Sequence, residues 1–401
     1  MHCRVKKRRI IIICKEFKFE AGRVVAALNR KCTYPQIPTC HSDPYFDGIN
    51  AEKIEVIFHS NNLTDERDIG AIILIYLQCK EEQEVIRVIE VLLKNPYVIF
   101  AEPDYFIDTH IIPNDPYFRY LWGMENINSP SAWDYTTGSR SVVVGVADSG
   151  IDYNHPDITG NMWVALDQNG NPADSCGNSL DETGHGTHVA GTIGAVGNNF
   201  IGVTGVCWNI RLASLKIGNA FFNLAAAIRA IDYANENNIP ILNNSWGERF
   251  DSSLLRFAID HYNGLFIASA GNDGTNNDIF PVYPACYDSR NIIAVAATEP
   301  NGKLASFSNY GTASTDIAAP GLYILSTDIN GGYSYMSGTS MAAPHVAGAA
   351  ALLKALRPDF TALDMKNIIL SSVNRQPDLF NKVLSGGALN IYRMVEMAIR
   401  S

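Results

Sequence analysis

The feature that most constrains this chain is the stretch from Gly338 to Gly348, which reads Gly-Thr-Ser-Met-Ala-Ala-Pro-His-Val-Ala-Gly. A Gly-Thr-Ser turn leads into small apolar residues that continue to Leu353, and these favour a helix that packs very closely against its neighbours. Backbone N–H groups in the first turn of a helix have no partner within it, so they can stabilise negative charge near Ser340. The stretch predicts a buried helix that presents a serine at its start. Taken alone, Gly-Thr-Ser is better explained by Thr339 or Ser340 acting only as an N-cap.

From Asn114 onward, short apolar runs alternate with stretches that favour helix. The apolar runs lack period-2 alternation, which is typical of strands covered on both faces. The expected strands are Val142–Ala147, Arg211–Lys216, Ile239–Asn243, Leu265–Ala270 and Asn291–Ala296. The expected helices are Thr187–Ala195, Leu224–Asn237, Ser252–Tyr262, Thr339–Lys354, Thr361–Ser371 and Tyr392–Arg400. This order predicts an α/β fold, a three-layer α/β/α sandwich with a mostly parallel sheet, whose ligands bind beyond the C-terminal ends of the strands.

Residues 1–113 are expected to form a separate, small α+β domain. Its expected strands are Arg9–Cys14, Ile54–Phe58, Ala71–Gln78 and Val98–Glu102, and its expected helices are Glu20–Asn29 and Glu81–Lys94. Apolar residues recur at helical spacing in the second of these helices. The order strand, helix, two strands, helix, strand is that of a ferredoxin-like domain. Between Thr33 and Gly48, Pro, Asn, Asp and Ser residues indicate a surface insertion.

Composition limits the partners and leaves the compartment open. A formal net charge of −10 argues against nucleic-acid binding, and no apolar run approaches the ~20 residues that cross a membrane. The apolar run Ile10–Cys14 is shorter than the roughly 7–15 residues of a secretory signal core. The eight cysteines show no Cys-x-x-Cys spacing, so scattered free thiols are expected.

Three stretches together resemble the motifs of subtilisin-like serine proteases, the subtilase family. They are the serine stretch, Val144–Asp152 around Asp148, and His185–Gly191. Their order, Asp, His, Ser, is that of subtilisin rather than that of chymotrypsin or the α/β-hydrolases. The resemblance spans roughly Asn114 to the C-terminus, and Asn114–Phe118 is similar to the thermitase branch. It implies a subtilisin-like catalytic domain over residues 114–401.

The residue types in these motifs suit a serine endopeptidase that works through an acyl-enzyme. A serine hydroxyl is a poor nucleophile and needs a base, for which His185 is the candidate because imidazole titrates near neutral pH. Asp148 is expected to accept a hydrogen bond from the other ring nitrogen and to stabilise the imidazolium. The resemblance also implies that Asn272 donates to the oxyanion beside the Ser340 backbone N–H.

Two further histidines, His188 and His345, lie inside the helices that follow these catalytic positions. We expect both to be packed and hydrogen-bonded rather than to act as second bases.

The resemblance implies substrate contacts as well. One segment is expected to pair with an extended substrate backbone, and another to form the pocket for the P1 side chain. The residues are Ser245, Trp246 and Gly247 for the backbone, and Ser269, Ala270, Gly271 and Val282 for the pocket. The small wall residues favour a medium or large apolar P1 side chain, with some tolerance for a basic one from Asp273. Asp181 and Glu182 are expected to alter the S2 rim.

A calcium site is implied by the loop Val196–Val203. Backbone carbonyls and an Asn side chain are hard oxygen donors of the kind that Ca²⁺ prefers. The implied ligands are Asp115, Asp157, Val196, Asn199, Ile201 and Val203. A second group, Asp167, Asn169, Asn171 and Asp174, has calcium-like spacing but matches no motif of the family, so a polar loop is the alternative there.

The front domain ends in Ala101–Tyr105 and resembles the inhibitory propeptide of subtilases. This implies a self-processing zymogen whose propeptide acts as an intramolecular inhibitor and is cut near Asp108–Pro113. The family is exported, and the substrates are expected to be proteins or peptides cut by a monomer. One alternative is an accessory domain that is never removed; another is a catalytically silent pseudoprotease that keeps this domain as a lid.

Overall fold

The structure is a computed structural model. It describes residues 19–29, 48–59, 69–105, 111–163 and 179–401, together with the backbone of the short strands β6 (Ala165–Leu166) and β7 (Pro172–Ala173). The chain divides into two compact units, Met1–Thr109, here called the front unit, and His110–Ser401, here called the main unit. Each is described by itself below.

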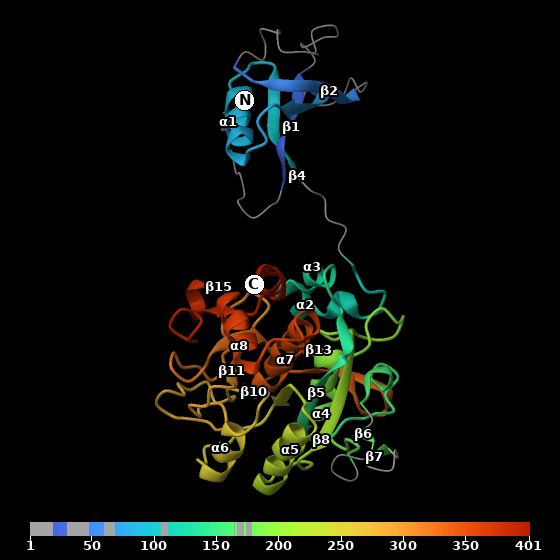
Figure 1. Ribbon diagram of the computed structural model, residues 1–401, viewed down its shortest axis with the longest axis vertical. Helices are drawn as coiled ribbons and strands as arrows, with labels where there is room; N and C mark the ends of the chain where they lie inside the picture. The colour runs from blue at the N-terminus through green and yellow to red at the C-terminus, as the bar shows by residue number, and fades with distance from the viewer. Residues whose placement is uncertain are drawn as a thin grey trace, which may run out of the picture. The chain divides into compact units, whose positions relative to one another are not determined.

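The front unit is built on a four-stranded antiparallel sheet with the strand order β2-β3-β1-β4 (Figure 1). Its elements are β1 (Phe19–Asn29), β2 (Ala51–His59), β3 (Ile69–Leu77), α1 (Glu82–Leu92) and β4 (Val98–Tyr105). Because β3 and β4 both pair antiparallel with β1, they run parallel to each other with β1 between them. This is the split βαβ arrangement that a ferredoxin-like order produces. The apolar face of α1 packs on this sheet through Val85, Val88 and Ile89.

One expected helix of the front unit is wrong. Residues 20–29 belong to the central strand β1, in which Val24, Ala26 and Leu28 are buried at every second position. A period of two is that of a strand, and hydrogen bonds to β3 on one side and β4 on the other outweigh the helix preference of Ala, Arg and Leu. The expected strand Arg9–Cys14 lies outside the described residues, as does the expected insertion except for Gly48.

The main unit is built on an eight-stranded sheet with the order β15-β16-β12-β11-β10-β9-β5-β8. Neighbouring strands are parallel except for the pair β15–β16. The strands are β5 (Gly138–Asp148), β8 (Asn209–Lys216), β9 (Ile241–Asn244), β10 (Leu265–Ser269), β11 (Ile292–Thr298), β12 (Ile317–Pro320), β15 (Asn374–Arg375) and β16 (Gly387–Ala388). The mostly parallel sheet is confirmed.

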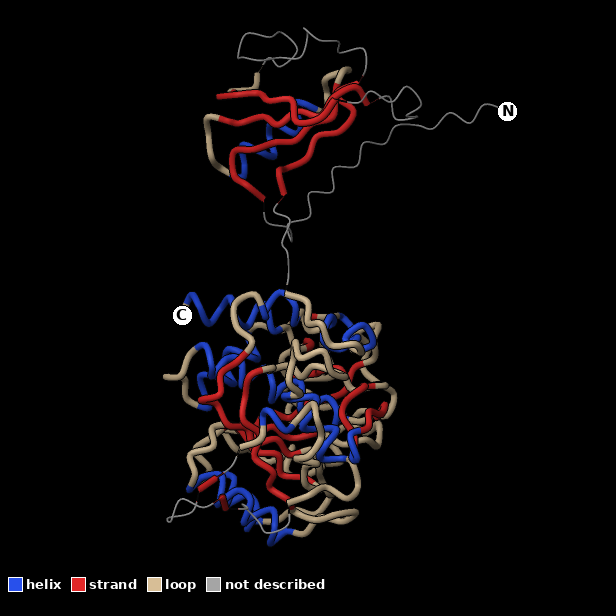
Figure 2. Tube along the Cα trace, turned by 90° about the vertical axis from the view of Figure 1, so that its right-hand side faces the viewer, coloured by secondary structure: helices blue, strands red, loops and turns tan. Residues whose placement is uncertain are grey.

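Helices cover both faces of this sheet, so the three-layer sandwich is confirmed (Figure 2). One layer contains α2 (Trp122–Asn126), α3 (Ser129–Trp133), α4 (His185–Gly194), α7 (Thr339–Leu356), α8 (Ala362–Ser371) and α9 (Ile391–Arg400). The other contains α5 (Leu224–Glu236) and α6 (Ser253–Asp260). Strand β5 shows the division: Val144 and Val146 belong to the first core, whereas Val143 and Ala147 belong to the second.

Helix α7 is the buried centre of the first layer, as the serine stretch predicts. It is buried from Thr339 to Leu353 except at Ser340 and contacts strands β5, β9, β10, β11 and β12. Its small residues allow this close approach to the sheet. A hairpin that the sequence did not indicate, β13 (Ile324–Asp328) and β14 (Gly332–Met336), packs against α4.

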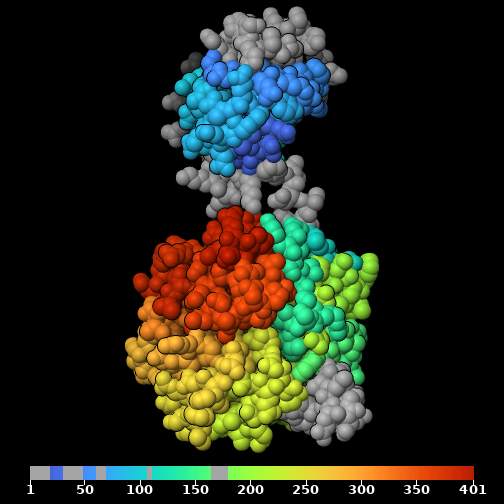
Figure 3. All heavy atoms as spheres, viewed as in Figure 1, coloured from blue at the N-terminus to red at the C-terminus, as the bar shows by residue number. Residues whose placement is uncertain are grey.

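The two ends of the main unit lie side by side. Helix α9, in red, borders the teal segment that contains α2 and α3 in Figure 3. The Ile391 N–H donates to the Ile127 carbonyl, and the rings of Tyr135 and Tyr392 lie in contact. Among the described residues, no helix has the length and apolar character needed to cross a membrane.

Candidate active site

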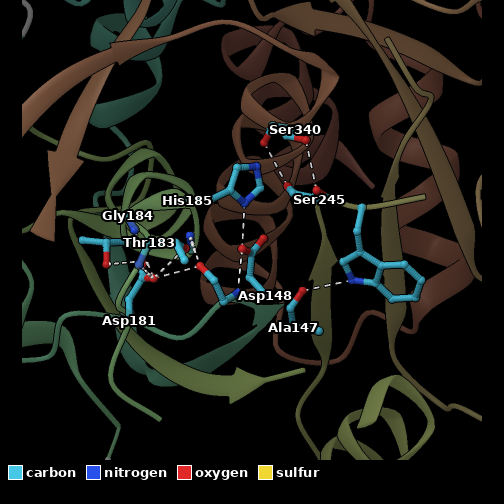
Figure 4. A network of polar contacts seen from close by, with 12 residues as sticks. Ala147, Asp148, Asp181, Thr183, Gly184, His185, Ser245 and Ser340 are labelled. Carbon is cyan, nitrogen blue, oxygen red and sulfur yellow. Dashed lines mark hydrogen bonds and ion pairs between the residues drawn. The ribbon is translucent and has the colours of Figure 1, made fainter. Parts of the chain in front are cut away.

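Asp148, His185 and Ser340 each stand at the end or the start of a secondary-structure element. Asp148 is the last residue of β5, His185 is the first of α4, and Ser340 is the second of α7. Strand C-termini and helix N-termini meet at one edge of a parallel sheet, so residues far apart in sequence converge there. The His185 ring lies between the Asp148 carboxylate and Ser340 (Figure 4).

His185 and Asp148 form a close pair, with 2.7 Å between Nδ1 and Oδ1. Asp148 is fully buried, and its Oδ1 also accepts from the Ser149 N–H at 2.7 Å. Burial by itself lowers the pKa of His185, but the charge and hydrogen bond of Asp148 outweigh it and raise that pKa above its ordinary value. With Nδ1 donating to the carboxylate, Nε2 is the ring nitrogen that remains to accept a proton.

The Ser340 hydroxyl donates to the Ser245 carbonyl at 3.0 Å, and the Ser245 hydroxyl donates back to the Ser340 carbonyl at 2.9 Å. Ser340 and His185 line the same cleft without a hydrogen bond between them. To pass its proton to His185, the Ser340 hydroxyl must first release the Ser245 carbonyl. Catalytic hydrogen bonds are often incomplete until substrate is bound, so this geometry is compatible with a base and its nucleophile.

Asn272 is held by the first residue of α7. Its Oδ1 accepts from the Thr339 N–H at 2.8 Å and from the Thr339 hydroxyl at 3.0 Å. The contact satisfies one unpaired N–H at the start of the helix. Because Oδ1 is engaged, Nδ2 is the group that Asn272 can offer to a ligand, next to the Ser340 N–H in the same turn.

Asp181 is a buried carboxylate that organises the segment before His185. It is 4% exposed, so the expectation that it alters the S2 rim is wrong. Its oxygens accept six hydrogen bonds at 2.7–3.1 Å, from Ser149 Oγ, Thr183 N, Thr183 Oγ1, Gly184 N, Thr187 N and Thr187 Oγ1. Burial alone raises the pKa of Asp181, but these hydrogen bonds outweigh it and hold that pKa below its usual value. Its neighbour Glu182 is exposed and accepts from the Asn219 side chain.

The role of Asp181 is to fasten the start of α4. An acidic side chain near a helix N-terminus pairs with the unbonded N–H groups of the first turn, and Asp-x-x-Gly-His before a helix is the sequence signal for it. Ser149, next to Asp148, donates to Asp181 and accepts from the Gly186 N–H at 2.9 Å. The network in Figure 4 therefore ties the backbone on either side of the His185–Asp148 pair.

The candidate base, nucleophile and oxyanion donor border a cleft of about 640 Å³, here called the active-site cleft. Its lining includes His185, Ser340 and Asn272, and six of the expected substrate-contact residues: Ser245, Trp246, Gly247, Ser269, Gly271 and Val282. The seventh, Ala270, does not line the cleft. It is fully buried, with its N–H donating to the Val295 carbonyl, because neighbouring residues of an extended segment face opposite sides.

The cleft lining carries an ion pair. Arg249 Nη2 lies 3.0 Å from Asp273 Oδ2, and both side chains are about half exposed. The sequence predicts that Asp273 adds some tolerance for a basic P1 side chain, but the charge of Asp273 is already matched by Arg249.

A family model described as "Subtilase family" matches residues 139–391. The chain belongs to the subtilase family. It is 39% identical over 272 residues to a thermophilic serine proteinase of Bacillus sp. (strain AK1), covering 66% of this chain and 65% of that relative. It is 37% identical over 250 residues to thermitase of Thermoactinomyces vulgaris, covering 60% of this chain and 85% of that relative. A solved protease structure from Pseudoalteromonas arctica PAMC 21717 superposes with a TM-score of 0.63 at 30% identity, covering 71% of this chain and 99% of that one.

In this subtilase the two other histidines of the motif helices, His188 and His345, are buried. His188 Nε2 lies 3.0 Å from the Ile324 carbonyl, and His345 Nδ1 lies 2.9 Å from the Met341 carbonyl. Burial lowers the pKa of each imidazole to about 4. Both rings are therefore neutral near pH 7 and serve in packing, as the sequence indicated.

The expected calcium loop brings two carboxylates together. Asp157 accepts from Asn199 Nδ2 and from the Val203 N–H, each at 2.8 Å, while Asp115 Oδ2 accepts from the Asn198 N–H at 2.7 Å. Asp115 Oδ1 is buried without a hydrogen-bond partner. Burial, with a smaller contribution from the charge of Asp115, raises the pKa of Asp157 to about 6.

These features fit a hard cation. A buried carboxylate oxygen without a partner and two like charges at close range are both relieved by a positive ion. The described residues contain no group of three or more His, Cys, Asp or Glu side chains that could hold a metal, so an ion here would need neutral oxygen donors as well. Carbonyl and amide oxygens supplement carboxylates in calcium sites. The second expected group, Asp167, Asn169, Asn171 and Asp174, lies outside the described residues.

Proposed function

We propose that the main unit is a serine endopeptidase that hydrolyses peptide bonds through an acyl-enzyme on Ser340. The observation that carries this proposal is the 2.7 Å hydrogen bond between His185 and Asp148, in a cleft also lined by Ser340 and Asn272. A base, an orienting carboxylate, a nucleophile and an oxyanion donor are the groups that acyl transfer needs.

The reaction follows from these positions. Ser340 Oγ attacks the substrate carbonyl carbon while His185 Nε2 takes the hydroxyl proton, and the charge of the resulting imidazolium is matched by Asp148. The tetrahedral oxyanion accepts from the Ser340 N–H and from Asn272 Nδ2. His185 then donates this proton to the nitrogen of the leaving amine as the C–N bond breaks. The acyl group remains bound to Ser340 as the acyl-enzyme. A water molecule, with His185 again as base, releases the acid product and restores the serine.

The substrate class follows from the cleft. Ser245, Trp246 and Gly247 offer backbone groups along one wall, so an extended peptide can add to this edge as a strand. A Cβ on Gly247 would lie 2.9 Å from one Val282 methyl group, and a Cβ on Gly271 would lie 3.4 Å from the other. Val282 thus lies close to both Gly247 and Gly271, and this apolar contact surface suits an uncharged, apolar P1 side chain. Flexible segments of proteins and peptides are the proposed substrates.

A structural calcium ion is the proposed cofactor. Asp115, Asp157 and Asn199, with carbonyls of Val196, Ile201 and Val203, would hold it in the loop described above. The ion would supply positive charge to the buried carboxylates and would fix the loop.

The front unit is the proposed inhibitory propeptide of a zymogen. In favour of a binding role, the face of its sheet opposite α1 exposes Phe58 and Phe100 in one cross-strand row with Ile72 and Ala27. Exposed apolar surface of this kind often marks an interaction site. We propose a cut near residues 108–113 and a monomeric product. A silent pseudoprotease has no observation in its favour, because each of the four chemical positions holds a competent side chain.

The experiment uses the full chain and Ser340→Ala. Wild-type protein is expected to acquire a new N-terminus near residue 114, to react with a fluorophosphonate at one site, and to cleave a peptide p-nitroanilide. Ser340→Ala is expected to keep Met1 and to do neither. If folded wild-type protein, with an unchanged N-terminus, fails to react with the fluorophosphonate, the peptidase proposal is overturned.

A further inference from the structure

Asn309 lies in the loop between β11 and β12 and is fully buried. Its side chain does not reach the active-site cleft, yet it contacts the loop that carries Asn272. Asn309 Oδ1 accepts from the Asp273 N–H at 2.9 Å and from the Thr275 N–H at 3.1 Å. Both donors follow Asn272 in the chain.

The same residue also holds the backbone that precedes Asn272. The Asn309 N–H donates to the Gly271 carbonyl at 2.9 Å. Gly271 has φ +107°, and a Cβ there would lie 2.5 Å from Asn309 Nδ2. The loop therefore needs a glycine at this position, both for its conformation and for the close approach of Asn309.

A second buried amide completes the arrangement. Asn309 Nδ2 donates to Asn277 Oδ1 at 3.0 Å, and Asn277 Nδ2 donates to the Ala270 carbonyl at 2.8 Å. The backbone from Ala270 to Thr275 is thus held from one buried side and Asn272 stands at its centre. On the other side, Thr339 holds the Asn272 side chain itself.

We propose that Asn309 is a positioning residue for the oxyanion hole. This inference rests on the proposed peptidase function. An oxyanion donor stabilises the transition state only if it is already in place when charge develops, since moving it at that moment costs the energy that it would supply. Asn-Asp-Gly is strong turn chemistry and has no fixed geometry of its own. Asn309 supplies that geometry by clamping the backbone on both sides of Asn272.

The role differs from a general contribution to stability. A residue that only stabilises the fold lowers the melting temperature and leaves kcat per active molecule unchanged. A residue that positions the oxyanion donor lowers kcat and kcat/KM together and leaves KM nearly unchanged, because the lost interaction is made only in the transition state. It must also act through Asn272.

The test is a double-mutant cycle between Asn309→Ala and Asn272→Ala in the full chain. Active serines are counted by end-point labelling with a fluorophosphonate, and kcat and KM are measured with a peptide p-nitroanilide that has Phe at P1. Asn309→Ala is expected to lower kcat per labelled serine about tenfold to 100-fold, the range that a displacement of about 1 Å can cause, with KM changed by less than about twofold. In the Asn272→Ala background the same substitution is expected to lower kcat by less than about twofold.

Two variants serve as controls. Asn291 is another structural amide, partly buried and bonded to three backbone carbonyls, but it lies immediately before β11, at the end of the sheet away from the cleft. Asn291→Ala is expected to lower the melting temperature without changing kcat. Asn277→Ala removes the support of Asn309 Nδ2 and the bond to the Ala270 carbonyl but leaves the Asn309 contacts to Asp273 and Thr275. It is expected to lower kcat less than Asn309→Ala, which keeps the proposal testable if the latter does not fold.

The proposal is overturned if Asn309→Ala lowers kcat by the same factor in both backgrounds, or if it affects kcat no more than Asn291→Ala. Should Asn309→Ala fail to fold, an Asn277→Ala variant with unchanged kcat overturns it as well. Failure of the peptidase function looks different, since the wild-type chain would then neither label nor cleave the peptide.

Discussion

Arg249 and Asp273 form an ion pair that joins the two walls of the active-site cleft. Arg249 follows the wall that contains Gly247, Asp273 follows the wall that contains Gly271, and Nη2 lies 3.0 Å from Oδ2. A half-exposed pair of this kind contributes little to the free energy of unfolding. Its effect is on the charge that a substrate meets at the mouth of the proposed P1 pocket.

Arg249→Ala is expected to raise kcat/KM for a peptide with Lys at P1 by about 1.4-fold to fivefold relative to one with Leu. The substitution leaves the Asp273 carboxylate without its partner, and a half-exposed pair is worth about 0.2–1 kcal/mol. The measurement is kcat/KM for matched peptides that differ only at P1, and the gain should shrink at high salt.

The matched control for this prediction is Arg256→Ala. Arg256 pairs with Asp260 at 4.0 Å on α6, and neither residue lines the cleft. Its loss should leave the Lys-to-Leu ratio unchanged. A ratio that moves equally in both variants, or not at all in Arg249→Ala, would show that Arg249 does not mask Asp273.

Activity is expected to fall on the acid side of neutrality as His185 becomes protonated. A base must be neutral to accept the Ser340 proton, and the pKa of His185 lies above its ordinary value because of Asp148. The acid limb of kcat/KM should therefore have its midpoint above about pH 6.5, the value of free imidazole. Asp148→Asn removes the charge, so the limb should move to lower pH while kcat falls by about 10⁴-fold, the loss known for the equivalent change in a chymotrypsin-type triad. An acid limb that stays in place in Asp148→Asn contradicts this account.

The His185–Asp148 pair also makes the free energy of unfolding depend on pH. Because the folded-state pKa of His185 is raised, the favourable interaction is fully present below the unfolded-state pKa and is lost as pH rises through the folded one. Stability and activity thus respond to the titration of His185 in opposite directions.

The sequence predicts which residues lie at the catalytic edge of the sheet, but it does not predict the buried side chains that hold them in position. Asp148, His185 and Ser340 stand at element ends, and apolar runs locate such ends without knowledge of tertiary contacts. Asn309 is 36 residues from Asp273, its partner in space, so no local pattern connects the two. Asp181 is close to His185 in sequence, yet its partner Ser149 lies 32 residues away. Local propensity favours a helix over residues 20–29, where the structure has the central strand β1. Whether a segment forms a central strand depends on its pairing partners, and local propensity does not contain them.

Asp181→Asn is expected to destabilise the main unit by about 2–4 kcal/mol. One carboxylate accepts six hydrogen bonds, and an amide, with a single acceptor oxygen, leaves unpaired either the buried donors of Thr187 or those of Ser149 and Gly184. The pKa of Asp181 is held low, so its contribution is present above the unfolded-state pKa and is lost as pH falls through the folded one. The difference in unfolding free energy between wild type and Asp181→Asn should therefore shrink in acid.

Glu182→Gln is the control for Asp181. This neighbour is exposed and has one polar contact, so its loss should change the unfolding free energy by less than about 0.5 kcal/mol. Equal effects of the two substitutions, measured by denaturant unfolding, would contradict the part assigned to Asp181.

Calcium removal is expected to lower the melting temperature more at pH 8 than at pH 5. Burial raises the pKa of Asp157 to about 6, so without an ion the carboxyl group is protonated at pH 5 and ionised at pH 8. As pH rises through 6, the metal-free protein must keep two buried charges close together, which costs stability, whereas the bound ion would match them. At a calcium concentration 100 times Kd, binding adds ~2.7 kcal/mol to the unfolding free energy, which corresponds to several degrees. The measurement is the melting temperature with calcium and with a chelator at both pH values, and Asp157→Asn should abolish the difference. A chelator effect of the same size at pH 5 and pH 8 would mean that Asp157 does not bind the ion.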